Sequence, residues 1–360
     1  MNPGLMVKLR PTGPWRIGPD SGARNQVDAV YHSDSLYSAV TSALTHLGFL
    51  EEWLDATARG VALENGAPAV CFSSCFPFAD EIGFIIPPRT IWPPSSPALL
   101  SARVRWKSAR FVPLGIVEAL LSGQTLDENQ WAVDGASGCL VPVGVAGPFR
   151  MGLRFNAAVD RLTGSTERHS TACLEFRSGA GIWALVSFAD SAAQGRWREP
   201  VETGIRLLAD SGFGGERSRG WGRSAIPEFT QGALPDMILP PRAPAAPPDN
   251  AVEQAPEEIK PPEPSNGAGA QWLLSLFTPG AADAVDWNRG NYTLLPRGGR
   301  VESTARSGDL KKQVQMIAEG SVLYAGATLR GSAPDVAPEG FAHPVFRAGF
   351  ALSIPLPEVA

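Results

Sequence analysis

A proline-rich stretch at residues 235–264 constrains the folding of this chain more than any other feature, because ten of its thirty residues are proline. Each proline removes a backbone hydrogen-bond donor and disfavours the interior of helices and sheets. The same stretch carries six acidic residues against two basic ones. Such a composition is typical of a segment that forms no packed core. We therefore expect a flexible insert at 231–270 between an N-terminal domain, 1–230, and a C-terminal domain, 271–360.

The composition as a whole is that of a globular protein, with 44% apolar residues over 360 positions. No stretch approaches the roughly 20 consecutive apolar residues that a membrane-spanning helix needs. The N-terminus also lacks the apolar run of a secretory signal. We therefore expect a cytoplasmic location and no membrane contact.

The net charge of −5 argues against a protein that coats nucleic acid with its whole surface. The proline-rich stretch supplies −4 of that charge, so the rest of the chain is close to neutral. Basic residues are concentrated in two places. The span between Glu81 and Glu118 contains no acid, and residues 289–312 contain six basic residues against two acids. Either cluster taken alone is typical of a solvated surface.

Apolar spacing predicts the secondary structure of the first 230 residues. The clearest helix is at 33–48, where apolar side chains recur three and four positions apart, with Ser33 as the expected N-cap and Gly48 as the expected stop. The other expected elements are a strand at 5–11, a strand at 69–78, a hairpin at 173–188 that turns at 178–181, a helix at 199–212 and a strand near 224–229. This order matches the ferredoxin-like β-α-β-β-α-β unit. We expect an α+β fold of two ferredoxin-like (RRM-like) domains, the second of them degenerate because helical signal is scarce after residue 270.

Residues 84–113 interrupt this pattern. They are rich in proline and basic side chains and show no clear period. We expect them to leave the domain body as a long basic excursion that reaches out as a hairpin.

The cysteines Cys71, Cys75, Cys139 and Cys173 do not form a strong metal-binding pattern. Only the first two are close together, and a C-x-x-x-C pair without a second Cys or His pair is a weak zinc signal. Buried free thiols are the favoured interpretation. We expect no metal ion and no cofactor, because no cofactor motif is present.

The most specific segment is the glycine-rich stretch SGFGGERSRGWGRS at 211–224. Glycine permits positive φ and a close approach of backbone to a ligand. Exposed N–H groups form anion-binding concavities, arginine holds phosphate through two hydrogen bonds, and tryptophan stacks on bases. The stretch lacks the mononucleotide-loop pattern, and it follows a helix whereas dinucleotide loops follow a strand. A polyanion partner is therefore favoured over a flexible basic turn. The residues expected to bind it are Gly212, Gly214, Gly215, Arg217, Ser218, Arg219, Gly220, Trp221, Gly222 and Arg223.

This stretch resembles the glycine-rich signature of the RAMP (repeat-associated mysterious protein) superfamily of CRISPR proteins. Further segments are similar, in order, to the fourth subunit of the type III-A CRISPR Csm complex. They are RIGPDSGARNQVDAVYHSDSLYSAV at 16–40, CFSSCFPF at 71–78, RFNAAVDRLTGSTE at 154–167 and, after the insert, YTLLPRGGRVES, KKQVQMIAEGSVLYAG and HPVFRAGFALSIPLP. The proline-rich insert departs from the family pattern and leaves the domain boundary near 230 open.

The resemblance implies a non-catalytic subunit that caps the 5′ handle of crRNA in antiviral defence. The partners it implies are crRNA, the large polymerase-like CRISPR subunit and the first backbone RAMP subunit. No catalytic residue and no metal site are expected. The RNA contacts expected outside the glycine-rich loop are Arg154, Arg161, Arg105, Lys107, Arg110 and His32. Trp106 and Trp221 are candidates for stacking on bases. His32 precedes a helix start, and for this residue a structural role is favoured over the RNA contact.

Three other functions remain open at this point. Some RAMP proteins are metal-independent endoribonucleases that process repeat RNA, and His32 is then the leading acid–base candidate. The same segments also fit the equivalent subunit of another type III subtype. An unrelated ferredoxin-like metabolic binder is the third alternative, although no cofactor motif supports it.

Overall fold

The computed structural model describes residues 1–19, 22–59, 66–95, 99–240, 269–302 and 308–357. Its main sheet is antiparallel, with strand order β11-β1-β10-β3-β4-β5 and with β2 also paired to β10. The strands of this sheet are β1 (Asn2–Leu9), β2 (Val70–Phe72), β3 (Phe76–Ala79), β4 (Ile82–Ile85), β5 (Val112–Pro113), β10 (Ala180–Phe188) and β11 (Glu228–Leu234). The helices that accompany it are α1 (Ser33–His46), α2 (Leu50–Leu54, continued by a π-helical turn Asp55–Arg59) and α6 (Ser191–Ser211).

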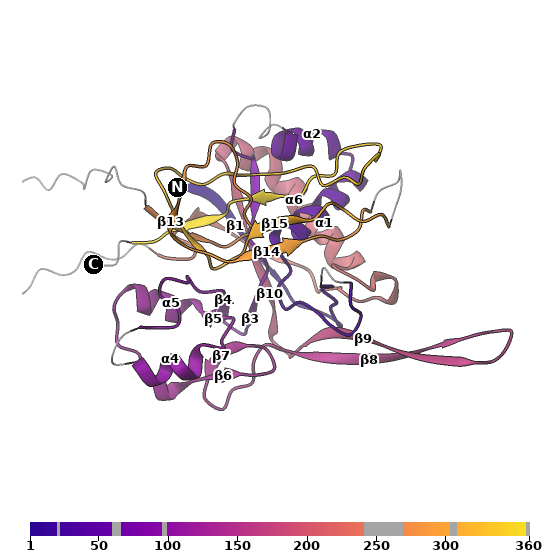
Figure 1. Ribbon diagram of the computed structural model, residues 1–360, viewed down its shortest axis with the longest axis horizontal. Helices are drawn as coiled ribbons and strands as arrows, with labels where there is room; N and C mark the ends of the chain where they lie inside the picture. The colour runs from indigo at the N-terminus through magenta and orange to yellow at the C-terminus, as the bar shows by residue number, and fades with distance from the viewer. Residues whose placement is uncertain (20–21, 60–65, 96–98, 241–268, 303–307, 358–360) are drawn as a thin grey trace, which may run out of the picture.

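The elements follow the order expected from the sequence: strand, helix, strand, strand, helix, strand. β2 and β3 act as one interrupted strand, because they pair with successive parts of β10. Figure 1 shows α1 and α6 side by side, and they contact β2 and the central strands β1 and β10. Every second residue of β1 from Leu5 to Leu9 points into the core, namely Leu5, Val7 and Leu9.

Helix α1 forms where the apolar spacing predicts it, and Leu36, Val40 and Leu44 are buried along one face. The predicted N-cap is wrong by one residue, because His32 occupies that position and Ser33 is already helical. The Ser33 hydroxyl instead accepts a hydrogen bond from the backbone N–H of Leu276 at 3.0 Å. The first turn of α1 is therefore tied to the C-terminal part of the chain.

Two predicted hairpins are wrong. β9 (Thr166–Phe176) does not pair with β10; it pairs along its whole length with β8 (Phe149–Val159). Figure 1 shows this β8–β9 hairpin projecting far from the body. The stretch 84–113 does not project, because it forms β4, helix α4 (Leu100–Trp106) and β5, and Trp106 is 0% exposed. Trp106 stacks on Trp92 at 6.0 Å between ring centroids, so it is a core residue and not a base-stacking one.

The insertion between β4 and β8 is completed by three short elements that pack beside α4. They are α5 (Leu114–Leu121), β6 (Trp131–Asp134) and β7 (Cys139–Pro142). The basic residues that were expected on a projecting arm therefore lie on a packed lobe of the molecule.

The C-terminal part is built of short antiparallel strands, and its four-stranded sheet has the order β13-β16-β12-β19 within the described residues. The strands are β12 (Gly269–Leu273), β13 (Val285–Asn291), β14 (Leu294–Arg297), β15 (Val314–Ile317), β16 (Val322–Ala325), β17 (Gly331–Ser332), β18 (Gly349–Phe350) and β19 (Ser353–Pro355). Trp272 and Phe350 join the same hydrophobic core as the main sheet. Residues 241–268 of the predicted insert lie outside the described residues, but the prediction is wrong for its first part, because β11 runs to Leu234 and Ile238 is buried in that core.

All four cysteines are free, and Cys75, Cys139 and Cys173 are buried, which confirms the free-thiol prediction. Across the described ranges, none of the helices combines the length and apolar character needed to cross a membrane.

Candidate nucleic-acid interface

The glycine-rich loop turns back on itself directly after α6. That helix starts at Ser191, eight residues before the predicted start. Asp190 caps it, because its carboxylate accepts a hydrogen bond from Ala193 N–H. The helix ends at Gly212, whose φ is 103°. A Cβ at Gly222 would lie 2.0 Å from the Phe213 carbonyl oxygen. Only glycine allows the two ends of the loop to approach this closely.

Most of the loop's backbone amides are used inside the fold. The N–H of Phe213 donates to Gly222 O at 3.0 Å, that of Gly215 to Arg16 O at 2.8 Å, and that of Gly222 to Pro14 O at 2.9 Å. Gly212, Arg219 and Gly220 also donate to carbonyls of the chain. The expectation that the glycine amides converge on phosphates is therefore wrong for these residues. A tightly packed loop must provide hydrogen-bond acceptors for its own backbone N–H groups, and these amides are already bound.

The arginine side chains of the loop remain at the surface. Arg217 and Arg219 lie on a short helical turn, Arg217–Arg219, that faces solvent with Ser218. Arg217 pairs with Glu302 at 2.6 Å and Arg219 with Glu216 at 3.0 Å. Exposed pairs of this kind contribute only about 0–1 kcal/mol, so a phosphate can replace the carboxylate at little cost.

Arg223 is exposed and Trp221 is half-buried at the other end of the loop. An open hollow of about 650 Å³ lies beside the helical turn. Its lining residues are Ser211, Gly214, Gly215, Glu216, Arg217 and Ser218.

Segment 12–16 joins the loop to the root of the projecting hairpin. Thr12 N–H donates to Arg223 O at 3.0 Å on one side, and Trp15 exchanges two backbone hydrogen bonds with Leu174 of β9 on the other. The buried Arg16 side chain donates to four carbonyls, including Ala172 O at 3.0 Å, and burial lowers its pKa. Arg16 is thus a structural residue that holds the loop against the hairpin.

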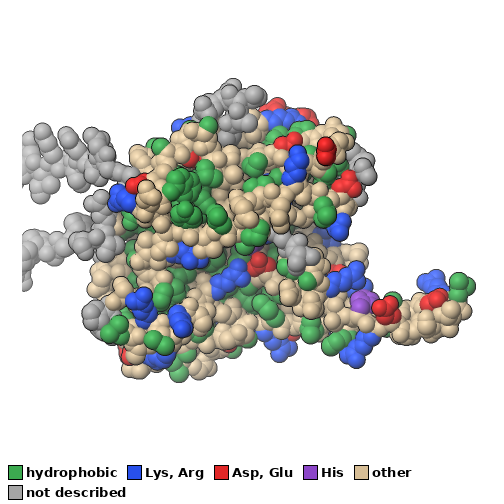
Figure 2. All heavy atoms as spheres, in the orientation of Figure 1, with side chains coloured by type: hydrophobic (Ala, Val, Ile, Leu, Met, Phe, Trp, Pro, Cys, Tyr) green, Lys and Arg blue, Asp and Glu red, His purple; other side chains and the backbone are tan. Residues whose placement is uncertain are grey.

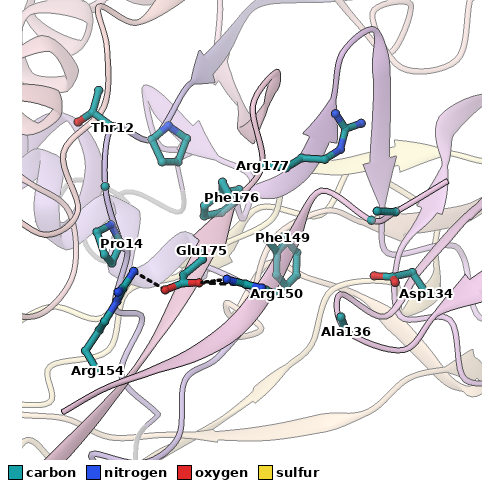
Figure 3. Close-up of a pocket in the computed structure, with 14 residues that line it drawn as sticks. Thr12, Pro14, Asp134, Ala136, Phe149, Arg150, Arg154, Glu175, Phe176 and Arg177 are labelled. Carbon is teal, nitrogen blue, oxygen red and sulfur yellow. Dashed lines mark hydrogen bonds and ion pairs between the residues drawn. The ribbon is translucent and has the colours of Figure 1, made fainter.

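A second hollow, of about 640 Å³, lies at the hairpin root (Figure 3). Arg150 and Arg154 extend from β8 toward the Glu175 carboxylate on β9, and both pair with it, at 3.0 Å and 2.5 Å. The two arginines and Glu175 together carry a net charge of +1. Phe149 and Phe176 pack at 5.6 Å and form an apolar wall of the hollow.

The hairpin itself has two unlike sides. Met151, Leu153 and Phe155 are each more than half exposed on one side of β8, and Arg168 lies over the Phe155 ring at 4.2 Å. Arg161 is exposed in the turn at the tip. Figure 2 shows basic side chains along the hairpin and at its root. An apolar side with arginines around it offers stacking faces and phosphate partners together.

His32 is buried, with 2% of its surface exposed, so its side chain cannot contact RNA directly. Its Nδ1 lies 2.7 Å from Glu319 Oε1 and its Nε2 lies 3.1 Å from Asp28 Oδ2. Burial opposes the charged form, but the Glu319 charge and the hydrogen bonds to both carboxylates outweigh it and raise the pKa of His32 to about 9. At neutral pH the imidazolium therefore donates from both nitrogens to the two carboxylates. We correct His32 from an RNA contact to a structural residue.

A second buried charge cluster lies at the start of α1. Asp34 accepts hydrogen bonds from Arg297 at 3.1 and 3.0 Å and from Arg347. Burial alone would raise the pKa of Asp34, but the two guanidinium groups hold it at about 2. These partners lie 263 and 313 residues along the chain, so no local pattern pointed to them.

Comparison with known proteins gives two findings. Residues 266–356 match the family model of the CRISPR Csm4 C-terminal domain. The whole fold resembles chains in two solved assemblies. One is the Csm3–Csm4 subcomplex in the type III-A CRISPR-Cas interference complex, with TM-score 0.59, 15% identity, and coverage of 98% of this chain and 99% of that chain. The other is the Csm1–Csm4 cassette in complex with cA4, with TM-score 0.54, 17% identity, and coverage of 99% and 98%.

Residues 266–356 thus resemble the C-terminal domain of Csm4, and the chain as a whole has a fold similar to those of chains in the two Csm4-containing assemblies. No curated protein sequence matches it. The Csm4 C-terminal match includes the hairpin base that supplies Glu302 and the segment that supplies Arg347. The structure thus connects this domain directly with the glycine-rich loop and with α1.

Three of the predicted RNA contacts lie on the packed lobe and not on the glycine-rich loop. Arg105 pairs with Glu128 at 3.1 Å, and Lys107 is exposed at the end of α4. Arg110 pairs at 3.1 Å with Asp28, the same carboxylate that holds His32. The structure therefore brings the loop and the hairpin root together, but it places these three residues on another element.

The sequence also missed residues that complete the surface, namely Arg150, Glu175 and Glu302. A signal for the first existed, because apolar and other residues alternate strictly over 149–157. Within the described parts of the chain, no group of three or more His, Cys, Asp or Glu side chains is arranged to hold a metal ion.

Proposed function

We propose that this protein is a non-catalytic, crRNA-binding subunit of a type III CRISPR complex, of subtype III-A, and that it caps the 5′ handle. The observation that carries the proposal is the line of surface arginines from the glycine-rich loop to the hairpin root. Segment 12–16 holds these two parts in contact. The fold and the Csm4 family match support the same assignment.

The arginines bind the sugar–phosphate backbone and do not distinguish one base from another. Arg217 and Arg219 are exposed on one helical turn, and Arg150 and Arg154 lie at the hairpin root. Each contact to phosphate releases counterions, so binding weakens as salt rises, with a slope of about −0.7 per contact for single strands.

The hairpin supplies the local contacts to bases. Its exposed side carries Met151, Leu153 and Phe155, with the Arg168 guanidinium over the Phe155 ring. Single-stranded RNA is recognised when its bases splay and stack on aromatic or arginine faces. A two-stranded ribbon that leaves the body is marginally stable alone, so RNA or a neighbouring subunit is expected to cover this side.

The subunit also bridges two partners in the proposed complex. The similar solved chains come from assemblies of Csm4 with Csm1 and with Csm3. By that likeness, the large polymerase-like subunit binds on one side and the first backbone subunit on the other, in the cytoplasm. The strand order of the main sheet supports a ferredoxin-like N-terminal unit, and we propose that the C-terminal sheet is its degenerate second copy.

The burial of His32 supports the non-catalytic assignment over the endoribonuclease alternative. A general acid or base must reach the proton that it moves. His32 is instead held between the carboxylates of Glu319 and Asp28.

The test is to replace Arg217 and Arg219 together by alanine and to measure binding of a labelled crRNA handle by fluorescence anisotropy. We expect affinity to fall about ten-fold at 0.1 M salt and the salt slope to fall by about 1.4. The matched control replaces Arg196 and Arg206, which are also exposed and paired with carboxylates. Equal binding by the two double variants would refute the role of the loop.

A further inference from the structure

A second loop, residues 22–28, is folded against the root of the β8–β9 hairpin. Its base is closed by Asp28 N–H, which donates to Ile17 O at 2.9 Å. The backbone N–H of Ala172 on β9 donates to Arg24 O at 2.8 Å. Ala172 lies two residues from Leu174, whose backbone is bound by segment 12–16, so both contacts are made on the same outer edge of β9. The loop therefore lies where the hairpin leaves the body.

The buried Arg16 guanidinium fixes the backbone of this loop. It donates to Ala23 O at 2.9 Å, to Arg24 O at 3.0 Å and to Gln26 O at 3.2 Å. The carbonyl of Arg24 thus accepts two hydrogen bonds, one from Arg16 and one from Ala172. A buried charge is costly unless hydrogen bonds compensate for it. The fold uses this buried arginine to hold the loop in one position against β9.

The side chains of the loop, in contrast, are left at the surface. Arg24, Asn25 and Gln26 are exposed. Within the described part of the chain, the Arg24 guanidinium has no hydrogen-bond or carboxylate partner. A fixed backbone that presents an uncompensated guanidinium group is preorganised for an anion, because no internal ion pair must be broken and little backbone freedom is lost on binding.

Arg24 lies at the junction of the two parts of the arginine surface. Arg16, which holds the Arg24 backbone, accepts the N–H of Gly215 on its own carbonyl at 2.8 Å. On the other side, Arg154 of β8 lies opposite the residue that precedes Ala172 in β9. The glycine-rich loop, the Arg24 loop and the hairpin root are thus joined through Arg16.

We propose that Arg24 binds an RNA phosphate at the hairpin root, and that Arg16 is the positioning residue that holds it there. The guanidinium group donates two parallel hydrogen bonds to a phosphate. This inference rests on the proposed function and deepens it, because it assigns a further phosphate ligand between the glycine-rich loop and the hairpin root.

The test measures the affinity of the full chain for a short fluorescein-labelled single-stranded RNA, by anisotropy over a series of salt concentrations. Arg24→Gln is expected to weaken binding about five-fold at about 0.1 M salt and to lower the salt slope by about 0.7. Arg24→Lys keeps the charge and is expected to keep the slope.

The matched control is Arg89→Gln. Arg89 is exposed, and its backbone is also held by two hydrogen bonds, because its N–H donates to Gly320 O at 2.9 Å and its carbonyl accepts one from Asn291 Nδ2 at 3.3 Å. Both of these partners lie in the C-terminal part of the chain. Arg89→Gln is therefore expected to leave the affinity and the salt slope nearly unchanged.

A further variant tests the positioning role. Arg16→Lys keeps the buried charge, but lysine has one donor nitrogen where Arg16 uses two. We expect binding to weaken about two- to three-fold in the unaltered background and not at all in an Arg24→Gln background. A loss of fold stability alone would weaken binding equally in the two backgrounds, and that result would refute the positioning role.

If the unaltered protein binds RNA but Arg24→Gln behaves like Arg89→Gln, this inference is overturned and the proposed function stands. If the unaltered protein binds no RNA, both fall.

Discussion

Asp34 joins the two ends of the chain at the first turn of α1, and its replacement by asparagine tests how much that junction contributes to stability. The carboxylate accepts two hydrogen bonds from Arg297 and one from Arg347. Asparagine has nearly the same shape but no charge, and it presents an NH2 group to one guanidinium. Two buried guanidinium groups then lose their counterion.

The structure sets the size of the effect. Asp34, Arg297 and Arg347 are all buried, and the removal of one partner from a buried ion pair costs about 3–5 kcal/mol. A large domain loses about 2 °C of melting temperature for each kcal/mol. We therefore expect Asp34→Asn to lower the melting temperature by about 6–10 °C.

Differential scanning calorimetry of Asp34→Asn and Asp55→Asn provides the comparison. Asp55 also pairs with an arginine, Arg59 at 3.1 Å, but that pair is exposed. An exposed pair contributes under about 1 kcal/mol, so Asp55→Asn is expected to lower the melting temperature by no more than about 2 °C. If the two variants melt at the same temperature, the cluster around Asp34 is not a stabilising junction.

Two further predictions concern the other buried cluster and the glycine-rich loop. The pKa of His32 is raised to about 9 from its ordinary 6.5, so its contribution of about 3 kcal/mol is complete below about pH 6.5 and is lost as the pH rises through 9. Urea unfolding should show that the stability difference between the unaltered protein and His32→Gln shrinks from pH 6 to pH 10; a constant difference would contradict this. Gly222→Ala places a Cβ 2.0 Å from Phe213 O at φ +79°, whereas Gly220→Ala, at φ +76°, meets nothing within 4 Å. Calorimetry should show a loss of about 1–2 kcal/mol for Gly220→Ala and a clearly larger one for Gly222→Ala, and equal losses would mean that the loop is not closely packed.

The parts of the fold that were predictable from sequence are those with a strong local signal. The apolar stripe of α1 predicted the helix that the structure has at 33–46. The order of expected strands and helices predicted the element order of the main sheet. The glycine-rich stretch was found because few structures other than a tight loop need so many glycines. These signals arise from residues that are close in sequence.

The parts that failed depend on contacts between distant residues. The turn at 178–181 looked like that of a hairpin, yet its two flanking strands pair with different partners, β8 and β1. The pairs of Asp34 with Arg347 and of Arg217 with Glu302 span 313 and 85 residues. Composition also misled, since Trp106 in a basic, proline-rich stretch is fully buried.

The amides of the glycine-rich loop show the same limit. Sequence alone indicated an anion-binding backbone, because glycine density is shared by loops that bind phosphate and by loops that pack against their own chain. The structure uses the amides of Phe213, Gly215 and Gly222 internally. The affinity for RNA is therefore expected from the side chains of the loop.

Photo-crosslinking of the full chain to a 4-thiouridine-labelled crRNA handle, followed by mass spectrometry of the crosslinked peptides, tests the central claim most directly. We expect crosslinks in the glycine-rich loop 211–224 and at the root of the β8–β9 hairpin, 149–155 and 174–177, with Trp221 and Phe155 among the labelled side chains. Crosslinks confined to α2 or to the α4–α5 lobe would contradict it.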